Sequence, residues 1–187
     1  IQPIQAGNYS LLVTCEHGDN RIPDQFQPLF KDYQDLLSTH RGFDPGALEM
    51  AKALAEAFAA PLVASTVSRL LVDLNRSIGN SSLHHTSVKQ KSAEFRAAII
   101  QYYYLPYRAL TEQIVRQVIA DHGQVVHIAS HSFTPELNGK VRSADIGLLY
   151  DPARLGEVSL CESWKIALNS CASELKVRRN YPYAGKG

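Results

Sequence analysis

Short apolar runs alternate with segments of helical periodicity along this chain, and this alternation constrains the fold more than any other feature. Five runs have the length and apolar content of buried strands, at residues 10–16, 61–66, 68–75, 124–131 and 145–151. The longest helical segments between and after them are 43–61, 93–123 and 156–175. The alternation predicts an α/β fold, a single-domain mixed and mostly parallel sheet with helices on both faces.

The helical segments carry expectations of their own. In segment 43–61, Asp44 and Pro45 suit the N-cap and the first helical position. In segment 93–123, apolar side chains keep one helical face, at Phe95, Ile99, Tyr102, Pro106, Leu110, Ile114 and Val118. Because proline in a helix interior removes a hydrogen bond, this segment is predicted to form two helices or one helix kinked at Pro106.

Composition and charge narrow the classes of protein. Of the 187 residues, 45% are apolar and 20% charged, with a net charge of +1 and no basic block. These values are typical of a globular protein and speak against nucleic-acid or membrane-surface partners. The apolar runs are too short for a membrane span, and the N-terminus lacks a signal-peptide pattern. The three cysteines lack metal-type spacing and are expected to be reduced thiols of a cytoplasmic protein.

Polar side chains that bind metals or anions collect where three of the predicted strands end. The strand at 10–16 runs into CEHGDN, that at 68–75 ends in DLNR, and that at 124–131 runs into SHSF. The carboxyl ends of parallel strands meet at one edge of a sheet, where α/β proteins bind ligands. The candidates are Glu16, His17, Asp19, Asn20, Asp73, Asn75, Arg76, His131 and Ser132. Histidines with carboxylates suit a zinc site, and an adjacent arginine would bind a carboxylate of the ligand.

Each candidate also has a structural interpretation. His17 could be an imidazole in a surface loop, and Asp73 could form a structural ion pair with Arg76. Asp44 could serve only as the N-cap of its helix. His40 is expected at the surface. Taken singly, the structural interpretations are the simpler ones; taken together, the residues favour a metal site.

Five stretches of this sequence resemble the N-formylglutamate amidohydrolase family. They are CEHGDNRIP, DPGALEMAKAL, SRLLVDLNRS, SHSFTPELNGKVRSADIGLLYD and VRRNYPYAGKG, and they span nearly the whole chain in order. A more distant similarity is to zinc carboxypeptidases and related deacylases, which carry a His-x-x-Glu pair, an Asn-Arg pair and a later His-Ser. Here the corresponding pairs are His17 with Asn20, Asn75 with Arg76, and His131 with Ser132.

The resemblance implies a phosphorylase/hydrolase-like fold and a metal-dependent amide hydrolase. Its substrate would be a small N-acylated acidic amino acid such as N-formyl-L-glutamate, from which the formyl or other acyl group is removed. The divalent metal, with zinc favoured, would be held by His17, His131 and one oxygen ligand among Asn20, Glu16 and Asp44. Asp73 would orient a ligand or Arg76, and Glu16, Asp44 and Asp73 are the candidate catalytic carboxylates.

Substrate binding is expected at a second set of residues. Asn75 and Arg76 would hold the α-carboxylate of the substrate, beside Ser132. Arg69 or Arg142 could hold a side-chain carboxylate, or could be a solvated surface cation.

The sequence departs from the carboxypeptidase pattern in two respects. Asn20 stands where that pattern has glutamate, so the third ligand stays open. The expected glutamate general base is not evident, and we expect it in a C-terminal segment that continues the single domain of residues 1–187. The alternatives are another acylamino-acid or carboxypeptidase-like hydrolase, or a non-catalytic module that binds a small carboxylate. The oligomeric state is left open.

Overall fold

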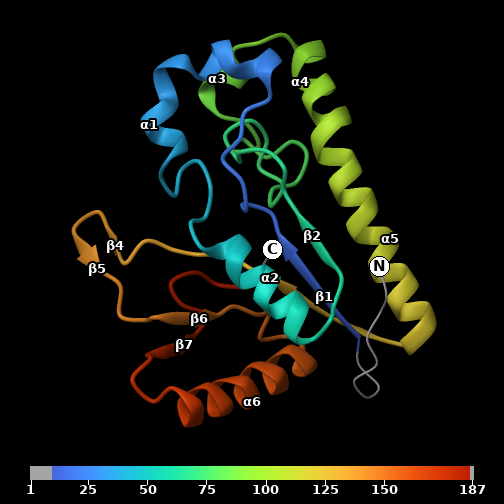
Figure 1. Ribbon diagram of the computed structural model, residues 1–187, viewed down its shortest axis with the longest axis vertical. Helices are drawn as coiled ribbons and strands as arrows, with labels where there is room; N and C mark the ends of the chain where they lie inside the picture. Colours follow the sequence, from blue (N-terminus) through green and yellow to red (C-terminus); the bar gives the residue numbers. More distant parts are fainter. Residues whose placement is uncertain (1–9, 186–187) are drawn as a thin grey trace. The chain divides into compact units, whose positions relative to one another are not determined.

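The computed structural model describes residues 10–185, which divide after Phe133 into two compact units (Figure 1). The first unit is built on a three-stranded parallel sheet of order β2-β1-β3. Its strands are β1 (Ser10–Cys15), β2 (Leu62–Ala64) and β3 (Val125–Ala129). The predicted mixed α/β class with a parallel sheet is thereby confirmed, whereas the single domain over residues 1–187 stays a prediction.

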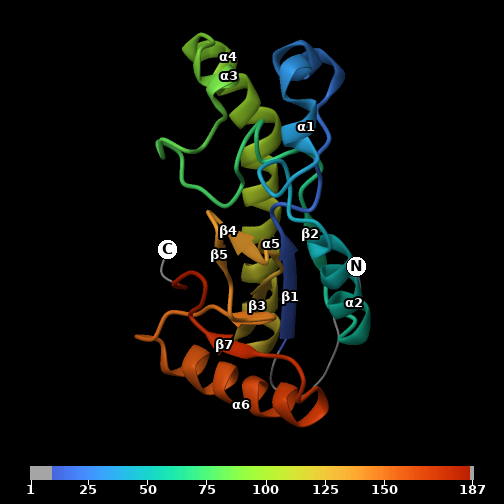
Figure 2. The ribbon, with the colours of Figure 1, turned by 90° about the vertical axis from the view of Figure 1, so that its left-hand side faces the viewer.

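Strand β1 is buried on both faces, because a helix packs on each side of it. Leu12 points into a cluster that α5 (Leu105–His122) covers, and Val13 and Cys15 point toward α2 (Ala47–Ala57). Figure 2 shows α2 and α5 on opposite sides of β1. Helix α2 meets the sheet with alanines at a spacing of four, Ala47, Ala51 and Ala55. Small side chains on one helical face allow the helix to lie close to the strand.

A long helical rod contains an irregular turn, and its α5 part packs on the other face of the sheet. It consists of α4 (Ala93–Ile99), the π-helical segment η2 (Ile100–Tyr104) and α5. The N–H of Leu105 donates to the carbonyl of Ile100, five residues back. The proline ring of Pro106 would clash with the carbonyl four residues before it, and a widened turn relieves this.

The widened turn changes which side chains the rod buries. The face predicted from periodicity is wrong at Tyr102, which is 73% exposed, at Leu110, which is 44% exposed, and at Pro106, which is also exposed. Tyr104 and Tyr107 are buried in their place. The physical reason is that one extra residue in the turn rotates the later part of the helix relative to an ideal 3.6-residue repeat.

Residues 68–75 are not the predicted strand but a series of turns. Their apolar side chains do belong to the core, with Leu71 and Val72 fully buried. Backbone hydrogen bonds from Asp73 N–H to the Leu83 carbonyl (2.8 Å) and from His85 N–H to the Leu70 carbonyl (3.0 Å) take the place of a strand ladder. The apolar run therefore records burial, which a packed loop satisfies as well as a strand does.

Short helical segments complete the first unit, η1 (Asp24–Tyr33), α1 (Gln34–Leu37) and α3 (Thr86–Lys89). In the second unit, α6 (Leu155–Cys171) connects the parallel strands β6 (Ile146–Leu148) and β7 (Val177–Arg179). Strands β4 (Glu136–Leu137) and β5 (Lys140–Val141) form a hairpin around Asn138 and Gly139, whose φ angles are both positive. Within residues 10–185, the helices are too short or too polar to cross a membrane.

Candidate metal centre

Two histidines meet at one edge of the sheet because β1 and β3 are neighbouring parallel strands. The register pairs Thr14 with Ala129, so the chain places Glu16 and His131 two residues later beside each other. His17 follows directly, and its ring centroid lies 4.9 Å from that of His131. This confirms that the two strand ends meet, as the positions of the candidate residues along the chain predicted.

A third element brings a carboxylate to the two imidazoles. The backbone N–H of Asp44 donates to the carbonyl of His17 (2.8 Å), which fixes the loop before α2 against the end of β1. The predicted N-cap role of Asp44 is wrong: the N-cap is Gly46, at a φ of 80°, and no side chain caps this helix. The carboxylate of Asp44 is therefore available to the imidazoles.

His17, Asp44 and His131 form a compact group of potential metal ligands, with one donor atom of each lying within 4.8 Å of the others. Asp44 Oδ2 is 2.9 Å from His131 Nδ1 and 3.4 Å from His17 Nδ1. His17 and Asp44 are buried and His131 is partly exposed. Two imidazoles and one carboxylate around a shared point form a donor set that zinc takes in proteins.

Each imidazole contacts a second carboxylate on its far side. His17 Nε2 is 2.7 Å from Asp73 Oδ1, and His131 Nε2 is 3.3 Å from Glu16 Oε2. A histidine that binds a metal through one nitrogen commonly donates its other N–H to a carboxylate, which fixes the orientation of the ring. Both imidazoles are therefore held with their Nδ1 atoms toward Asp44.

The carboxylates around the imidazoles are held ionised. Burial alone would raise the pKa of Glu16, but His131 and the Tyr107 hydroxyl, which donates to Oε1 at 2.8 Å, lower it to about 2. Burial alone would likewise raise the pKa of Asp73, but His17 and Arg69 lower it to about 2. The pKa of Asp44 is lowered well below its ordinary value by both imidazoles, against the effect of burial.

The two histidines differ in the groups that their ring nitrogens contact. Burial alone would lower the pKa of His131, but contacts with Asp44 and Glu16 raise it to about 9. His17 donates through Nε2 to the ionised Asp73, and its Nδ1 is buried and has no hydrogen-bond partner in the described part of the chain. In a neutral imidazole with Nε2–H, Nδ1 carries a lone pair, which is what a metal requires. The donor set and this unpartnered atom fit a divalent metal.

Residues 9–187 match the model of the N-formylglutamate amidohydrolase family. The chain is also similar to "gene product Atu2144 from Agrobacterium tumefaciens", whose crystal structure it matches with 33% identity and a TM-score of 0.79 over 93% of this chain and 69% of that one. The chain belongs to the N-formylglutamate amidohydrolase family. The resemblance drawn from the sequence motifs is thereby confirmed, and no curated protein matches the chain.

Membership in the N-formylglutamate amidohydrolase family indicates a hydrolase of amide bonds in small molecules. Asn75 and Arg76, the predicted carboxylate-binding pair, lie near the candidate metal centre through their contacts with Asp73. Asp73 accepts the backbone N–H of Asn75 (3.0 Å) and lies 4.0 Å from Arg76 Nε. The Arg76 side chain is 50% exposed, and no closer ion pair engages it within the described residues. The Tyr104 hydroxyl donates to the Arg76 carbonyl (2.8 Å) and so fixes its backbone. Arg76 is thus anchored while its guanidinium faces solvent.

Three other predicted site residues, Asn20, Arg69 and Arg142, make contacts that differ from those expected from the sequence. Asn20 is exposed, and its amide donates to the Leu37 carbonyl (3.3 Å) rather than facing the imidazoles. The two arms of Arg69 bind Asp44 (3.3 Å) and Asp73 (3.0 Å). Arg142 belongs to the second unit, where it donates to the Tyr183 hydroxyl (2.8 Å), and its role toward substrate stays a prediction.

Two residues beside the centre, Tyr107 and His40, were not predicted from the sequence to lie there. Tyr107 was hidden because the π turn moves it onto the buried face of α5. His40, expected at the surface, is partly buried and lies 3.3 Å from the Ser132 hydroxyl. A usable signal existed for His40, since it stands four residues before Asp44 in one short polar loop.

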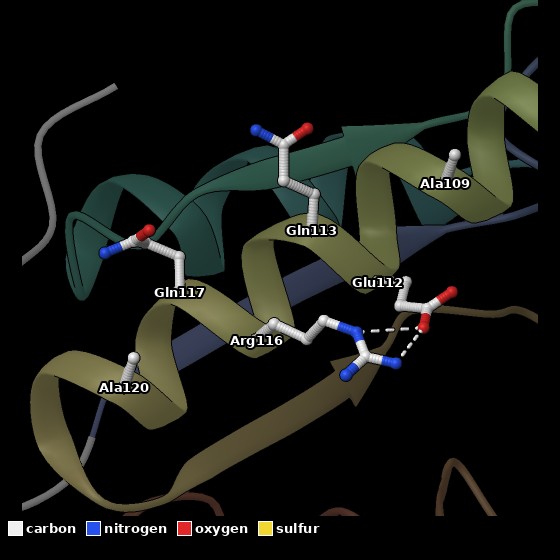
Figure 3. A pocket seen from close by; sticks show the side chains of 6 residues that line it. All are labelled: Ala109, Glu112, Gln113, Arg116, Gln117 and Ala120. Carbon is white, nitrogen blue, oxygen red and sulfur yellow. Dashed lines mark hydrogen bonds and ion pairs between the residues drawn. The ribbon is translucent and has the colours of Figure 1, made fainter.

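A surface depression on α5 has a different character. It is lined by Ala109, Glu112, Gln113, Arg116, Gln117 and Ala120. Figure 3 shows an ion pair between Glu112 and Arg116 on this face of the helix, with the strands of the sheet behind it. Because the depression holds no member of the metal centre, it adds nothing to the site.

Proposed function

We propose that this protein is a metal-dependent hydrolase that removes a formyl or other acyl group from an N-acylated acidic amino acid such as N-formyl-L-glutamate. The main support for a metal is the buried Nδ1 atom of His17, which lacks a hydrogen-bond partner in the described chain. His17 and His131 both face Asp44, so the three residues offer ligand atoms close together. Membership in the family supports the amide-hydrolase reaction. Arg76 and Asn75, beside the centre, support a substrate that carries a carboxylate.

The proposed ligand atoms are His17 Nδ1, Asp44 Oδ2 and His131 Nδ1, with zinc favoured by two imidazoles and one carboxylate. A divalent metal bound there supplies a Lewis acid that polarises an amide carbonyl and makes water a nucleophile near neutral pH. Asp44 fills the place of the third, oxygen ligand that the sequence left open among Asn20, Glu16 and Asp44.

The neighbouring residues hold the proposed ligands in place. Asp73 accepts from His17, and Glu16 pairs with His131, so each imidazole keeps its orientation. Arg69 contacts both Asp44 and Asp73 and offsets part of their charge before a cation binds. In this proposal Arg69 is a positioning residue rather than the substrate-binding residue that the sequence suggested.

Arg76, assisted by Asn75, is the proposed binding group for the substrate carboxylate. The guanidinium is half exposed, and its loose 4.0 Å approach to Asp73 leaves donors for a two-pronged contact with a carboxylate. Because Asp73 also holds His17, the same side chain connects carboxylate recognition with the metal centre. An N-acyl amino acid bound at Arg76 would therefore have its amide near the proposed ligands.

The test combines metal content with turnover. Purified wild type and His131→Ala are analysed for zinc, and formate release from N-formyl-L-glutamate is measured on the same samples, with His122→Ala as a control outside the centre. We expect near-stoichiometric zinc and turnover in wild type and control, and loss of both in His131→Ala. Zinc with carboxylate binding but no turnover of N-formyl or N-acyl amino acids would favour the binding module. Failure to take up any divalent metal would refute the centre.

A further inference from the structure

His40 lies on a turn beside the candidate metal centre, and backbone hydrogen bonds fix this turn. The N–H of Gly42 donates to the Thr39 carbonyl (2.8 Å), and the Gly42 carbonyl accepts from the Ser68 hydroxyl (2.8 Å) and the Arg69 N–H (3.2 Å). A side chain at Gly42 would meet the backbone of Leu37 at 2.2 Å, so only glycine fits this turn. The turn is thus fixed by its own backbone and does not need the His40 side chain to hold it.

The imidazole of His40 meets a hydroxyl directly beside a proposed ligand. His40 Nε2 lies 3.3 Å from Ser132 Oγ, although the two residues are 92 positions apart in sequence. Ser132 follows His131, and its backbone N–H donates to Asp44 Oδ2 (3.4 Å). Both side chains are partly exposed, so a substrate can reach them from solvent. Neither His40 nor Ser132 is a proposed metal ligand, so their contact is available for another purpose.

We propose, resting on the proposed function, that His40 positions Ser132 for substrate recognition. His40 Nε2–H donates to Ser132 Oγ, which leaves the serine hydroxyl hydrogen to be donated to the carbonyl oxygen of the substrate amide. Ser132 is then the residue that touches the substrate, and His40 acts through it. A serine hydroxyl can rotate freely, and an imidazole that occupies one of its acceptor directions limits where its hydrogen points. A donor held toward the oxygen where charge develops lowers the barrier of acyl transfer.

The first experiment measures the double-mutant cycle of His40→Ala and Ser132→Ala with zinc-loaded enzyme. We expect each single variant to lower kcat by about 100-fold with little change in KM, and the double variant to be no worse than Ser132→Ala. His40→Gln, whose amide nitrogen can occupy the place of Nε2, should recover activity, and His40→Asn, which is too short, should not. Multiplicative losses in the double variant would show that His40 acts independently of Ser132 and would overturn the proposal.

The second experiment does not depend on turnover. Long-range ¹H–¹⁵N spectra of the protein, at a pH where the His40 ring is neutral, report which ring nitrogen carries the hydrogen. We expect the hydrogen on Nε2, with an Nε2 shift that changes in Ser132→Ala. A hydrogen on Nδ1 would make Nε2 the acceptor of the serine hydroxyl, as in a nucleophile–base pair, and would overturn the proposal. Absence of any turnover by wild type would refute the proposed function, and the spectra would still decide the His40–Ser132 contact.

Discussion

Replacing Tyr107 by phenylalanine tests how much one buried hydroxyl beside the candidate metal centre stabilises the fold. Tyr107 donates to the carboxylate of Glu16, and Glu16 in turn pairs with His131. The same helical rod offers a matched control, because Tyr104 donates its hydroxyl to a neutral acceptor, the carbonyl of Arg76. Both hydrogen bonds are 2.8 Å long, and the two tyrosines are 8% and 5% exposed. The variants therefore differ mainly in the charge of the acceptor.

The magnitude follows from that charge. A hydrogen bond to a charged group contributes about 1.5–3 kcal/mol to stability, and one between neutral groups about 0.5–1.5 kcal/mol. Glu16 is ionised at neutral pH, since its pKa is lowered to about 2 by His131 and Tyr107 against the effect of burial. We expect Tyr107→Phe to cost about 2 kcal/mol and Tyr104→Phe about 1 kcal/mol. For a chain of this length, each kcal/mol lowers Tm by about 2–4 °C.

The assay is urea unfolding of the metal-free protein at neutral pH, with Tm as a second readout. The sign of the pH dependence is set by the depressed pKa of Glu16. Its stabilising contribution is present above the ordinary value of 4.5 and is lost as pH falls through about 2. The excess cost of Tyr107→Phe over Tyr104→Phe should therefore shrink as pH falls below 4.5. Equal costs for the two variants, or an excess that does not change with pH, would refute the reasoning.

Two further predictions concern the metal and the loop that carries Asp44. Asp44 and Glu16 raise the pKa of His131 to about 9 against the effect of burial, so His131 is protonated at neutral pH in the metal-free protein. Zinc binding should therefore release this proton, and the number of protons released should decline as pH rises through about 9. Calorimetry in buffers of different ionisation enthalpy measures this; release that is constant from neutral pH to beyond 9 would contradict it. Gly42→Ala should cost about 1–3 kcal/mol by overpacking and also weaken zinc binding, because its side chain would meet the Leu37 backbone at 2.2 Å. Gly123→Ala is the control, because the φ of 78° at Gly123 strains any other residue although the space around it is open. This variant should lower stability without changing zinc affinity. Equal zinc affinities of the Gly42→Ala and Gly123→Ala variants would contradict the argument.

The sequence by itself determined the parts of this protein that depend on local periodicity. The apolar runs around β1 and β3 are buried strands, and the polar residues that follow them, His17 and His131, had to meet once the strands were parallel neighbours. The sequence motifs also indicated the N-formylglutamate amidohydrolase family, and the match to the family model confirms it. These features could be predicted because apolar runs record burial, and because strands that alternate with helices along a chain form a parallel sheet.

Tertiary structure alone decided the third ligand candidate and the supports around it. Asp44 has the local pattern of an N-cap, yet a backbone hydrogen bond to His17 turns its carboxylate toward two imidazoles. His40 meets Ser132 across 92 positions, and Tyr107 reaches Glu16 only because a π turn rotates α5. The physical reason is common to all three: periodicity records whether a side chain is buried, but it does not record which distant group a loop or helix face will meet. That choice depends on hydrogen bonds and packing between segments far apart in the chain, which form only in the folded protein.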